Sequence, residues 1–414
     1  MKRTHFIIVF LLLAGMAVFA QDADVSLYTE EISRHDLSIF EIQDILRAVK
    51  DENHTGIGSF YNTAIQVFIR RWANYQTHQE RVALEESARM ILRGLAAERH
   101  TAAAPQIWQL VEYFNITHQQ NDGYIMYEAI MALGQIDAKN YAPHISIFLD
   151  NYNERGNADF QFRSKIHTVV PSLITALELL GEAVGVRPIF FASIGWYDSD
   201  TKLIAMNALT NLMNTLGEVI NVIISNVIAD PFNTPNIKYA AWLQLLRTQV
   251  PNEAKARVAI TALEASYAFP ATSRESLNIS RDMRLSAINI IREMGVQDDS
   301  VYPFLERTYR EAFETGSTDF ETIILVIRTL TASRSDEAIG LLTEFLRWLH
   351  SRRRSGPWGT VERDIMAVII PAIASTGTQS QTATQLLTII SRSSLYTGAE
   401  QTWARNALLQ LTGR

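Results

Sequence analysis

The chain has 414 residues, of which 47% are hydrophobic and 20% are charged, and it contains no cysteine. Its 37 Lys and Arg residues against 44 Asp and Glu residues give a formal net charge of −7. This is the composition of a folded globular protein rather than of a disordered chain. It excludes disulfide-stapled scaffolds and thiolate metal sites, and it argues against a dedicated nucleic-acid binder, which usually has a basic excess.

The first 20 residues have the pattern of a secretory signal peptide. Lys2 and Arg3 form a basic start, and residues 6–20 are apolar or small throughout. Ala20 precedes a cleavage site at Gln21. The alternative is an uncleaved anchor, but a membrane-spanning helix needs about 20 apolar residues, and no later stretch is long and apolar enough to span. We therefore expect an exported, periplasmic bacterial protein with a single mature domain over residues 21–414.

The rest of the chain has helical periodicity. In residues 38–53, apolar side chains recur at spacings of three and four, at Ile39, Ile42, Ile45, Leu46 and Val49. Ser38 and Glu41 have the spacing of a capping box at the start of this helix. The closest candidate for a strand, residues 188–193, is too short to carry a sheet. The sequence therefore predicts an all-α protein.

Polar, glycine-containing or proline-containing stretches predict breaks between helices. They include residues 51–59, 151–159, 229–235, 268–280, 314–319, 351–359 and 375–380. None of them is long enough to be a flexible linker between domains. Pro171 and Pro371 fall inside predicted helices, which they should kink or divide.

A small residue next to a large apolar one recurs near the middle of many predicted helices. The pairs are Ala132-Leu133, Ala176-Leu177, Ala208-Leu209, Ala241-Trp242, Ala287-Ile288 and Ala407-Leu408, with Val326-Ile327 and Val368-Ile369 as looser members. Their average spacing of about 39 residues is close to that of helical-pair repeats. Proline also recurs at predicted helix starts, at Pro105, Pro143 and Pro303.

The segment from Glu128 to Leu149 resembles the end of one HEAT repeat and the opening helix of the next. The resemblance to this armadillo-like family extends from about Ser38 to Leu411. It implies an α-solenoid of roughly eight or nine antiparallel helix pairs. It also implies a surface that binds protein partners, and the family has no shared catalytic residues.

Motifs for catalysis, metal binding and cofactor binding are absent from the sequence. The nine His residues form no His-x-x-x-His pattern, and there is no phosphate loop or nucleophile elbow. The sequence therefore predicts no cofactor and no metal site. The pair Trp196-Tyr197 ahead of Asp198 is more typical of a loop anchor and helix cap than of a sugar platform.

One short segment is a candidate binding site. It combines two tryptophans with three arginines, namely Trp348, Arg352, Arg353, Arg354 and Trp358. In an acidic chain, this predicted basic loop could bind an anionic peptide, a lipid headgroup or a wall polymer. The alternative is a solvated helix end, where the helix dipole favours cations and Trp348 packs in the core.

Two functional hypotheses follow. The first is a non-enzymatic interaction scaffold for envelope or periplasmic proteins. The second is an all-helical (α/α)-toroid enzyme or binding module that acts on a cell-envelope glycan, for which Tyr127 and Glu128 are candidate residues. A compact toroid of the mature length would have a radius of gyration of about 21 Å, whereas a solenoid would be longer.

Overall fold

The computed structural model describes residues 25–51, 56–72, 77–116, 123–270, 273–314, 319–356, 358–377 and 380–412. No strand occurs in these ranges and every long element is a helix, which confirms the all-α prediction. None of the helices there is long and apolar enough to cross a membrane. The predicted signal peptide lies outside the described residues.

The chain divides into two compact units between Leu216 and Gly217. The single domain expected over residues 21–414 stays a prediction. The described part of unit 1 starts with helical residues 25–32. It continues with α2 (Ile39–Asp51), α3 (Gly58–Arg71), α4 (His78–Ala97), α5 (Ala104–Tyr113), α6 (Tyr124–Gln135), α7 (Ala142–Ala158), α8 (Phe160–Ile166), α9 (Val170–Leu180), α10 (Val186–Ile194) and α11 (Ser199–Leu216).

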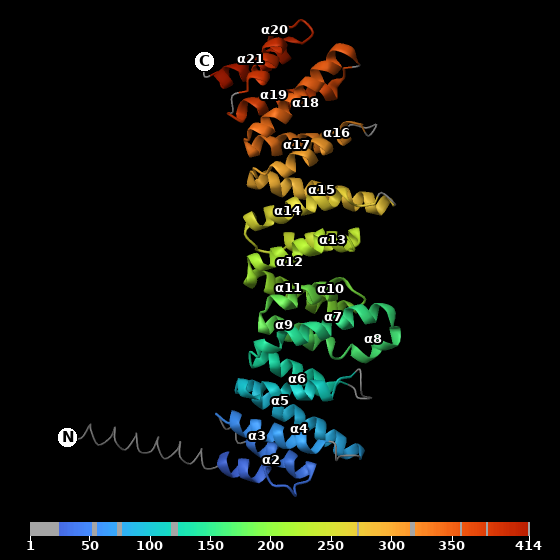
Figure 1. The fold of residues 1–414 in the computed structure, drawn as a ribbon, viewed down its shortest axis with the longest axis vertical. Helices are drawn as coiled ribbons and strands as arrows, with labels where there is room; N and C mark the ends of the chain where they lie inside the picture. Colours follow the sequence, from blue (N-terminus) through green and yellow to red (C-terminus); the bar gives the residue numbers. More distant parts are fainter. Residues whose placement is uncertain are drawn as a thin grey trace, which may run out of the picture. The chain divides into compact units, whose positions relative to one another are not determined.

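The helices of unit 1 pack as consecutive pairs in two layers (Figure 1). The pairs are α3 with α4, α5 with α6, α7 with α9 and α10 with α11. The second helices of these pairs also pack on one another in chain order, from α4 through α6 and α9 to α11, and α2 packs on α4 at the start of this row. We call this set the second-helix layer of unit 1 and the set α3, α5, α7 and α10 the first-helix layer.

Unit 2 repeats the arrangement. Its helices are α12 (Glu218–Ala229), α13 (Pro235–Leu246), α14 (Asn252–Tyr267), α15 (Arg274–Met294), α16 (Tyr302–Glu314), α17 (Phe320–Ser333), α18 (Asp336–Ser355), α19 (Thr360–Ser375), α20 (Gln381–Arg392) and α21 (Gly398–Thr412). The second-helix layer runs from α13 through α15, α17 and α19 to α21. In the first-helix layer, α12 packs on α14, and α18 packs on both α16 and α20.

The small–large pairs of the sequence all lie in the second-helix layers. They fall in α6, α9 and α11 of unit 1 and in α13, α15, α17, α19 and α21 of unit 2. The alanine of each of the six Ala pairs is at most 2% exposed. The approach is close between α6 and α9, where a Cβ atom on Gly134 would lie 2.9 Å from the Cα atom of Ala176. Small residues therefore set how near successive second helices can pack.

Most second helices end in the same way, with a residue in the left-handed conformation. These residues are Arg99, Asp137 and Gly181 in unit 1 and Gly295, Arg334 and Gly377 in unit 2. After α4, α6 and α15, the next amide N–H reaches back to a carbonyl oxygen five residues earlier, as in His100 N to Leu95 O at 3.0 Å. Such a cap satisfies the free carbonyls of the last helical turn and reverses the chain toward the next pair.

Several local signals have the predicted effect. The Ser38 amide donates to Glu41 Oε2 at 2.7 Å, and the Glu41 amide donates to Ser38 Oγ at 3.3 Å, which completes the capping box. Pro105, Pro143 and Pro303 each lie in the first turn of a helix. Pro171 does so in α9 and thus divides it from α8, whereas Pro371 lies inside α19.

Two segments that depart from the helical pattern in the sequence are helical in the structure. Residues 188–193, the strand candidate judged too short to carry a sheet, are part of helix α10, in agreement with the all-α prediction. The break expected over residues 151–159 is helical as far as Ala158, because tertiary contacts hold α7 together. The side-chain amide of Asn153 donates to Pro188 O at 2.9 Å. The ring of Trp196 lies so close to Gly156 that any Cβ atom there would overlap it.

The segment that follows α10 anchors a loop and caps a helix, as predicted. The indole N–H of Trp196 donates to Asn153 O at 3.2 Å. Asp198 accepts from the Thr201 amide at 2.8 Å, and this hydrogen bond is the main reason why the pKa of Asp198 is lowered. Trp196 therefore anchors the loop after α10, and Asp198 caps the start of α11.

Candidate functional site

The segment predicted as a basic loop is largely the C-terminal end of a helix. Trp348, Arg352, Arg353 and Arg354 belong to α18, and only Trp358 lies beyond it. The prediction of a loop is therefore wrong for the arginines, which form the last turn, where the helix dipole favours cations. The two tryptophan rings are associated with different arginines, so the five residues do not form one cluster.

Arg352 is tied to the start of the next helix. Its Nη2 atom lies 3.0 Å from Glu362 Oε1, and its guanidinium carbon lies 5.1 Å from the ring centre of Trp348. Burial of Glu362 opposes its ionisation, but hydrogen bonds from the backbone and Arg352 outweigh this, so the pKa of Glu362 is lowered. Arg352 thus joins α18 to α19.

Arg353 also contacts other parts of unit 2, whereas Arg354 is exposed to solvent. Arg353 Nε donates to Leu395 O at 3.0 Å, and its guanidinium carbon lies 4.8 Å from the ring centre of Trp358. Arg354 is exposed and makes no hydrogen bond or ion pair with any residue that the structure describes. Burial and the charge of Arg354 lower the pKa of His350, whose ring lies 2.5 Å from the Tyr396 hydroxyl.

Trp348 contributes to a pocket that the sequence did not predict. A cavity of about 320 Å³ lies between α16 and α18, and we call it the aromatic pocket. Its lining comprises Tyr309, Arg310, Phe313, Glu344, Phe345, Arg347, Trp348 and Ser351. The rings of Phe313 and Trp348 meet edge to face with centroids 4.4 Å apart, and those of Tyr309 and Phe345 stack at 3.6 Å. Four aromatic rings therefore form its walls.

Tyr309 is an almost completely buried residue of this pocket. The residue is 2% exposed, and its hydroxyl oxygen has no hydrogen-bond partner among the described residues. Burial raises the pKa of the Tyr309 hydroxyl far above its ordinary value, so the group stays protonated. An unpaired buried hydroxyl costs about 1–3 kcal/mol.

Two arginines at the rim of the aromatic pocket form exposed ion pairs with glutamates of their own helices. Arg310 pairs with Glu306 at 2.7 Å on the same helix, and Arg347 pairs with Glu344 on its own helix. The two arginine side chains are 58% and 48% exposed. Exposed pairs of this kind contribute only about 0.3–0.5 kcal/mol. An incoming carboxylate can therefore replace the local glutamate at little cost.

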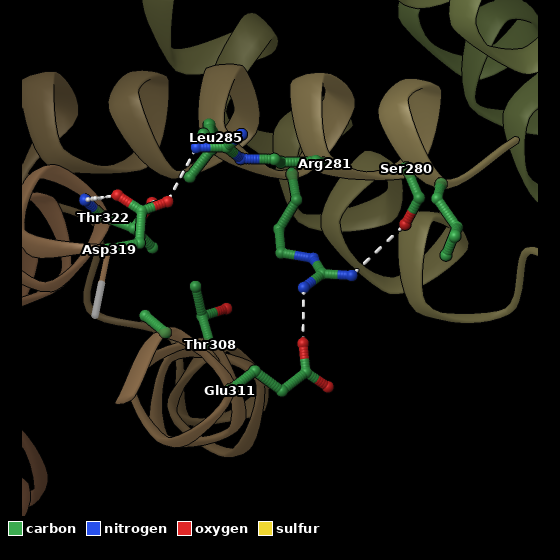
Figure 2. A pocket seen from close by; sticks show the side chains of 10 residues that line it. Ser280, Arg281, Leu285, Thr308, Glu311, Asp319 and Thr322 are labelled. Atoms are coloured by element: carbon green, nitrogen blue, oxygen red, sulfur yellow. Dashed lines mark hydrogen bonds and ion pairs between the residues drawn. The ribbon is translucent and has the colours of Figure 1, made fainter. Parts of the chain in front are cut away.

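A second cleft on the opposite side of α16 is ionic. It has a volume of about 600 Å³ and lies between α15, α16 and α17. Figure 2 shows Glu311 and Thr308 projecting from α16, with Asp319 beside Thr322 at the start of α17. Arg284 donates to Glu311 Oε2 at 2.7 Å and lies 3.8 Å above the ring centre of Tyr267. The charged groups at the centre of this cleft neutralise one another.

The other ion pair of this cleft is more exposed. Arg281 lies 2.7 Å from Asp319 Oδ2, and Asp319 also accepts from the Thr322 amide to cap α17. Burial of Asp319 raises its pKa, but the Thr322 hydrogen bonds and the Arg281 charge lower it more, so the net pKa is below the ordinary value. Arg281 and Asp319 therefore join α15 to α17 and leave no free acid for chemistry.

Unit 1 has a groove that contains the two candidates named for the enzyme hypothesis. Tyr127 and Glu128 line a shallow groove of about 870 Å³ formed by α4, α6 and α9. Both carboxylate oxygens of Glu128 accept hydrogen bonds from Arg93, at 2.6 and 3.2 Å. Arg89 lies 3.5 Å from the same carboxylate. Glu128 is thus paired with two arginines, and these contacts join α4 to α6.

No group of three or more His, Asp or Glu side chains among the described residues is arranged to hold a metal ion. A comparison of this chain with protein-family models and with curated proteins finds no match. The resemblance to HEAT repeats therefore stays a prediction from sequence.

Proposed function

We propose that this chain is an exported scaffold of HEAT-like helical repeats that binds protein partners without catalysing a reaction. The observation that carries the proposal is the placement of the small–large pairs, all of which lie in the second-helix layers. When each helix pair packs mainly on its neighbours, a protein has an extended surface rather than one central core. Such surfaces are used for binding.

The repeated chain reversals support the same proposal. Left-handed caps end second helices in both units, three of them at residues other than glycine. A left-handed backbone is strained for most residues with a side chain, so its recurrence at one position favours a common repeat design. On this account each unit is a segment of an α-solenoid, and residues 1–20 direct export to the periplasm.

We place the binding surface on unit 2, around α16 and α18. This region joins the aromatic pocket to the basic end of α18, where Arg354 is available to an anionic group. Partners are expected to be envelope or periplasmic proteins. The enzyme alternative is disfavoured, because Glu128 is held in ion pairs with Arg89 and Arg93.

A capture experiment tests the proposal. The purified chain is fixed on beads, exposed to detergent-solubilised envelope extract, and compared with Arg354→Glu. The control is Arg363→Glu, which reverses another exposed arginine, 50% exposed, on α19. We expect a stoichiometric protein partner on the wild type and on the control, and a reduced amount on Arg354→Glu. Retention of wall or glycan material with no protein would contradict the proposal and favour the glycan alternative.

A further inference from the structure

We propose that a groove on the second-helix layer of unit 2 binds an acidic segment of a partner protein. The groove has a volume of about 790 Å³ and is bounded by α15, α17 and α19. We call it the cationic groove, and its lining includes Arg292, Glu293, Arg328, Arg334, Val368 and Pro371. Because other helices than α16 and α18 form it, it adds a second contact to the proposed scaffold function.

Arginines outnumber acids in the cationic groove. Three arginines and one glutamate line it, and this glutamate, Glu293, lies 3.7 Å from Arg292 on the same helix. Arg328 and Arg334 are exposed, and neither makes a hydrogen bond or an ion pair with any residue that the structure describes. The charged residues of the lining therefore sum to +2 in a chain whose net charge is −7. Such a surface attracts a partner surface of negative charge.

The groove of unit 1 lacks this excess of positive charge. It is likewise bounded by three successive second helices, and each groove contains an arginine with left-handed backbone, Arg99 in unit 1 and Arg334 in unit 2. In unit 1, however, Arg93 and Arg99 are matched in number by Glu128 and Asp137. The positive charge is thus a property of the unit 2 groove rather than of the repeat design.

The backbone at Arg334 is strained. Arg334 ends α17 with a φ of 52°, whereas the turns after α15 and α19 have Gly295 and Gly377 in the left-handed conformation. Glycine adopts this conformation readily, but a side chain makes it unfavourable. No contact of the Arg334 side chain with the described residues offsets the strain, whereas a carboxylate of a bound segment would do so.

The α19 side of the cationic groove favours a polypeptide over a small anion. Val368, Pro371, Ala372 and Ser375 line it there, and none of them is charged. Pro371 has no N–H, so the carbonyl oxygen of Ala367 lacks the usual helical hydrogen bond from residue 371. This carbonyl belongs to the same face of α19 as Pro371, because residues four apart share a face. A peptide offers carboxylates to the arginines, an apolar side chain to Val368 and backbone N–H groups to such a carbonyl.

Fluorescence anisotropy with the full chain tests the inference. The probe is the peptide Glu-Glu-Leu-Glu-Glu-amide with a neutral dye on its amino end, and the control peptide has Gln in place of all four Glu. We expect the acidic peptide to bind about 10-fold more tightly, since each exposed charge contact contributes modestly. Equal binding of the two peptides would overturn the inference. Displacement of the acidic peptide by succinate at the same carboxylate concentration would also overturn it, because a site for small anions would then explain the binding.

Variants locate the contact. Arg328→Gln and Arg334→Gln should each weaken the binding of the acidic peptide about 3-fold, and the double change about 10-fold. The matched control is Arg99→Gln, which removes the left-handed arginine of the unit 1 groove and should leave the binding unchanged. Equal losses in Arg99→Gln and Arg334→Gln would mean that the peptide binds through unspecific attraction, and would overturn the assignment to this groove.

Arg334→Gly separates binding from folding. Glycine relieves the left-handed strain, so the melting temperature should rise, while the binding of the acidic peptide should weaken about 3-fold. Binding that is unchanged in Arg334→Gly would overturn the role of this arginine, whatever the melting temperature.

The outcome is separable from that of the proposed function. A chain that captures a stoichiometric partner but does not distinguish the two peptides keeps the scaffold proposal and overturns the groove assignment. A chain that binds the acidic peptide through Arg328 and Arg334 but captures no protein keeps the groove assignment and overturns the scaffold proposal.

Discussion

Gly134 of α6 faces Ala176 of α9 so closely that a Cβ atom on Gly134 would lie 2.9 Å from the Ala176 Cα atom. Replacing a helical glycine by alanine usually stabilises a helix by up to about 1 kcal/mol. Here the added methyl group would meet backbone rather than a flexible side chain. The sign of the effect should therefore reverse.

We predict that Gly134→Ala lowers the free energy of unfolding by about 1–3 kcal/mol, as expected for overpacking. The matched control is Gly340→Ala in α18, where a Cβ atom would have no neighbour within 4 Å. This control should be neutral or stabilising. Urea unfolding of the two variants and the wild type measures both effects, and a stabilised Gly134→Ala would show that α6 and α9 are not packed as described.

Arg284 and Arg281 provide a second matched comparison, because each lies 2.7 Å from a carboxylate oxygen but their burial differs. The Arg284 side chain is 16% exposed and the Arg281 side chain is 63% exposed. Arg284→Ala should cost about 2–3 kcal/mol, since it removes packing against Tyr267 as well as a shielded ion pair. Arg281→Ala should cost less than about 1 kcal/mol. Equal losses in chemical denaturation would contradict the description of the ionic cleft.

His350, near the basic end of α18, should make the free energy of unfolding depend on pH. Burial and the positive charge of Arg354 both disfavour its protonated form, so its pKa in the folded chain is below the ordinary value of about 6.5. Below pH ~6.5 the unfolded chain therefore binds more protons here than the folded chain. The free energy of unfolding should fall as the pH drops from there toward the folded-state pKa.

The contribution of Arg354 can be measured separately by NMR titration of His350. Arg354→Ser removes one of the two causes of the shift, so the pKa of His350 should rise toward its ordinary value. Arg363→Ser, which removes a charge that does not contribute to this shift, should leave it unchanged. An unchanged His350 pKa in Arg354→Ser would mean that Arg354 lies farther from the ring than described.

The export proposal has its own test. Expression of the full chain with a C-terminal tag should give a product whose mass corresponds to residues 21–414 plus the tag. The product should also appear in the periplasmic fraction. A Lys2→Glu and Arg3→Glu variant, which removes the basic start, should accumulate unprocessed. A wild-type product that keeps residues 1–20 would favour the uncleaved anchor.

Helical periodicity was sufficient to predict the all-α class, and the small–large pairs of the sequence all fall in the second-helix layers. Apolar spacing in α2 and the Ser38–Glu41 capping box are local signals, and local signals can be read without tertiary information. The helical course of residues 151–158 was missed because it depends on Trp196, a residue distant in sequence that packs on Gly156. The left-handed caps at Arg99, Asp137 and Arg334 were missed because they lack the glycine that marks most such caps.

The candidate site was predicted only in part. Trp348 was identified because it stands near a run of arginines, which is a pattern within a single segment. Its partners Tyr309, Phe313 and Phe345 come together only because α16 packs on α18. A comparison of helix pairs one repeat apart is the signal that could have found them, since Phe313 and Trp348 fall at related positions of successive first helices.

The claim on which the proposed function depends is that the helix pairs form a solenoid. Solution scattering from the full chain tests it most directly. A compact all-α protein of this length would have a radius of gyration of about 22 Å. The solenoid account predicts a clearly larger value, and a measured value near 22 Å would contradict it.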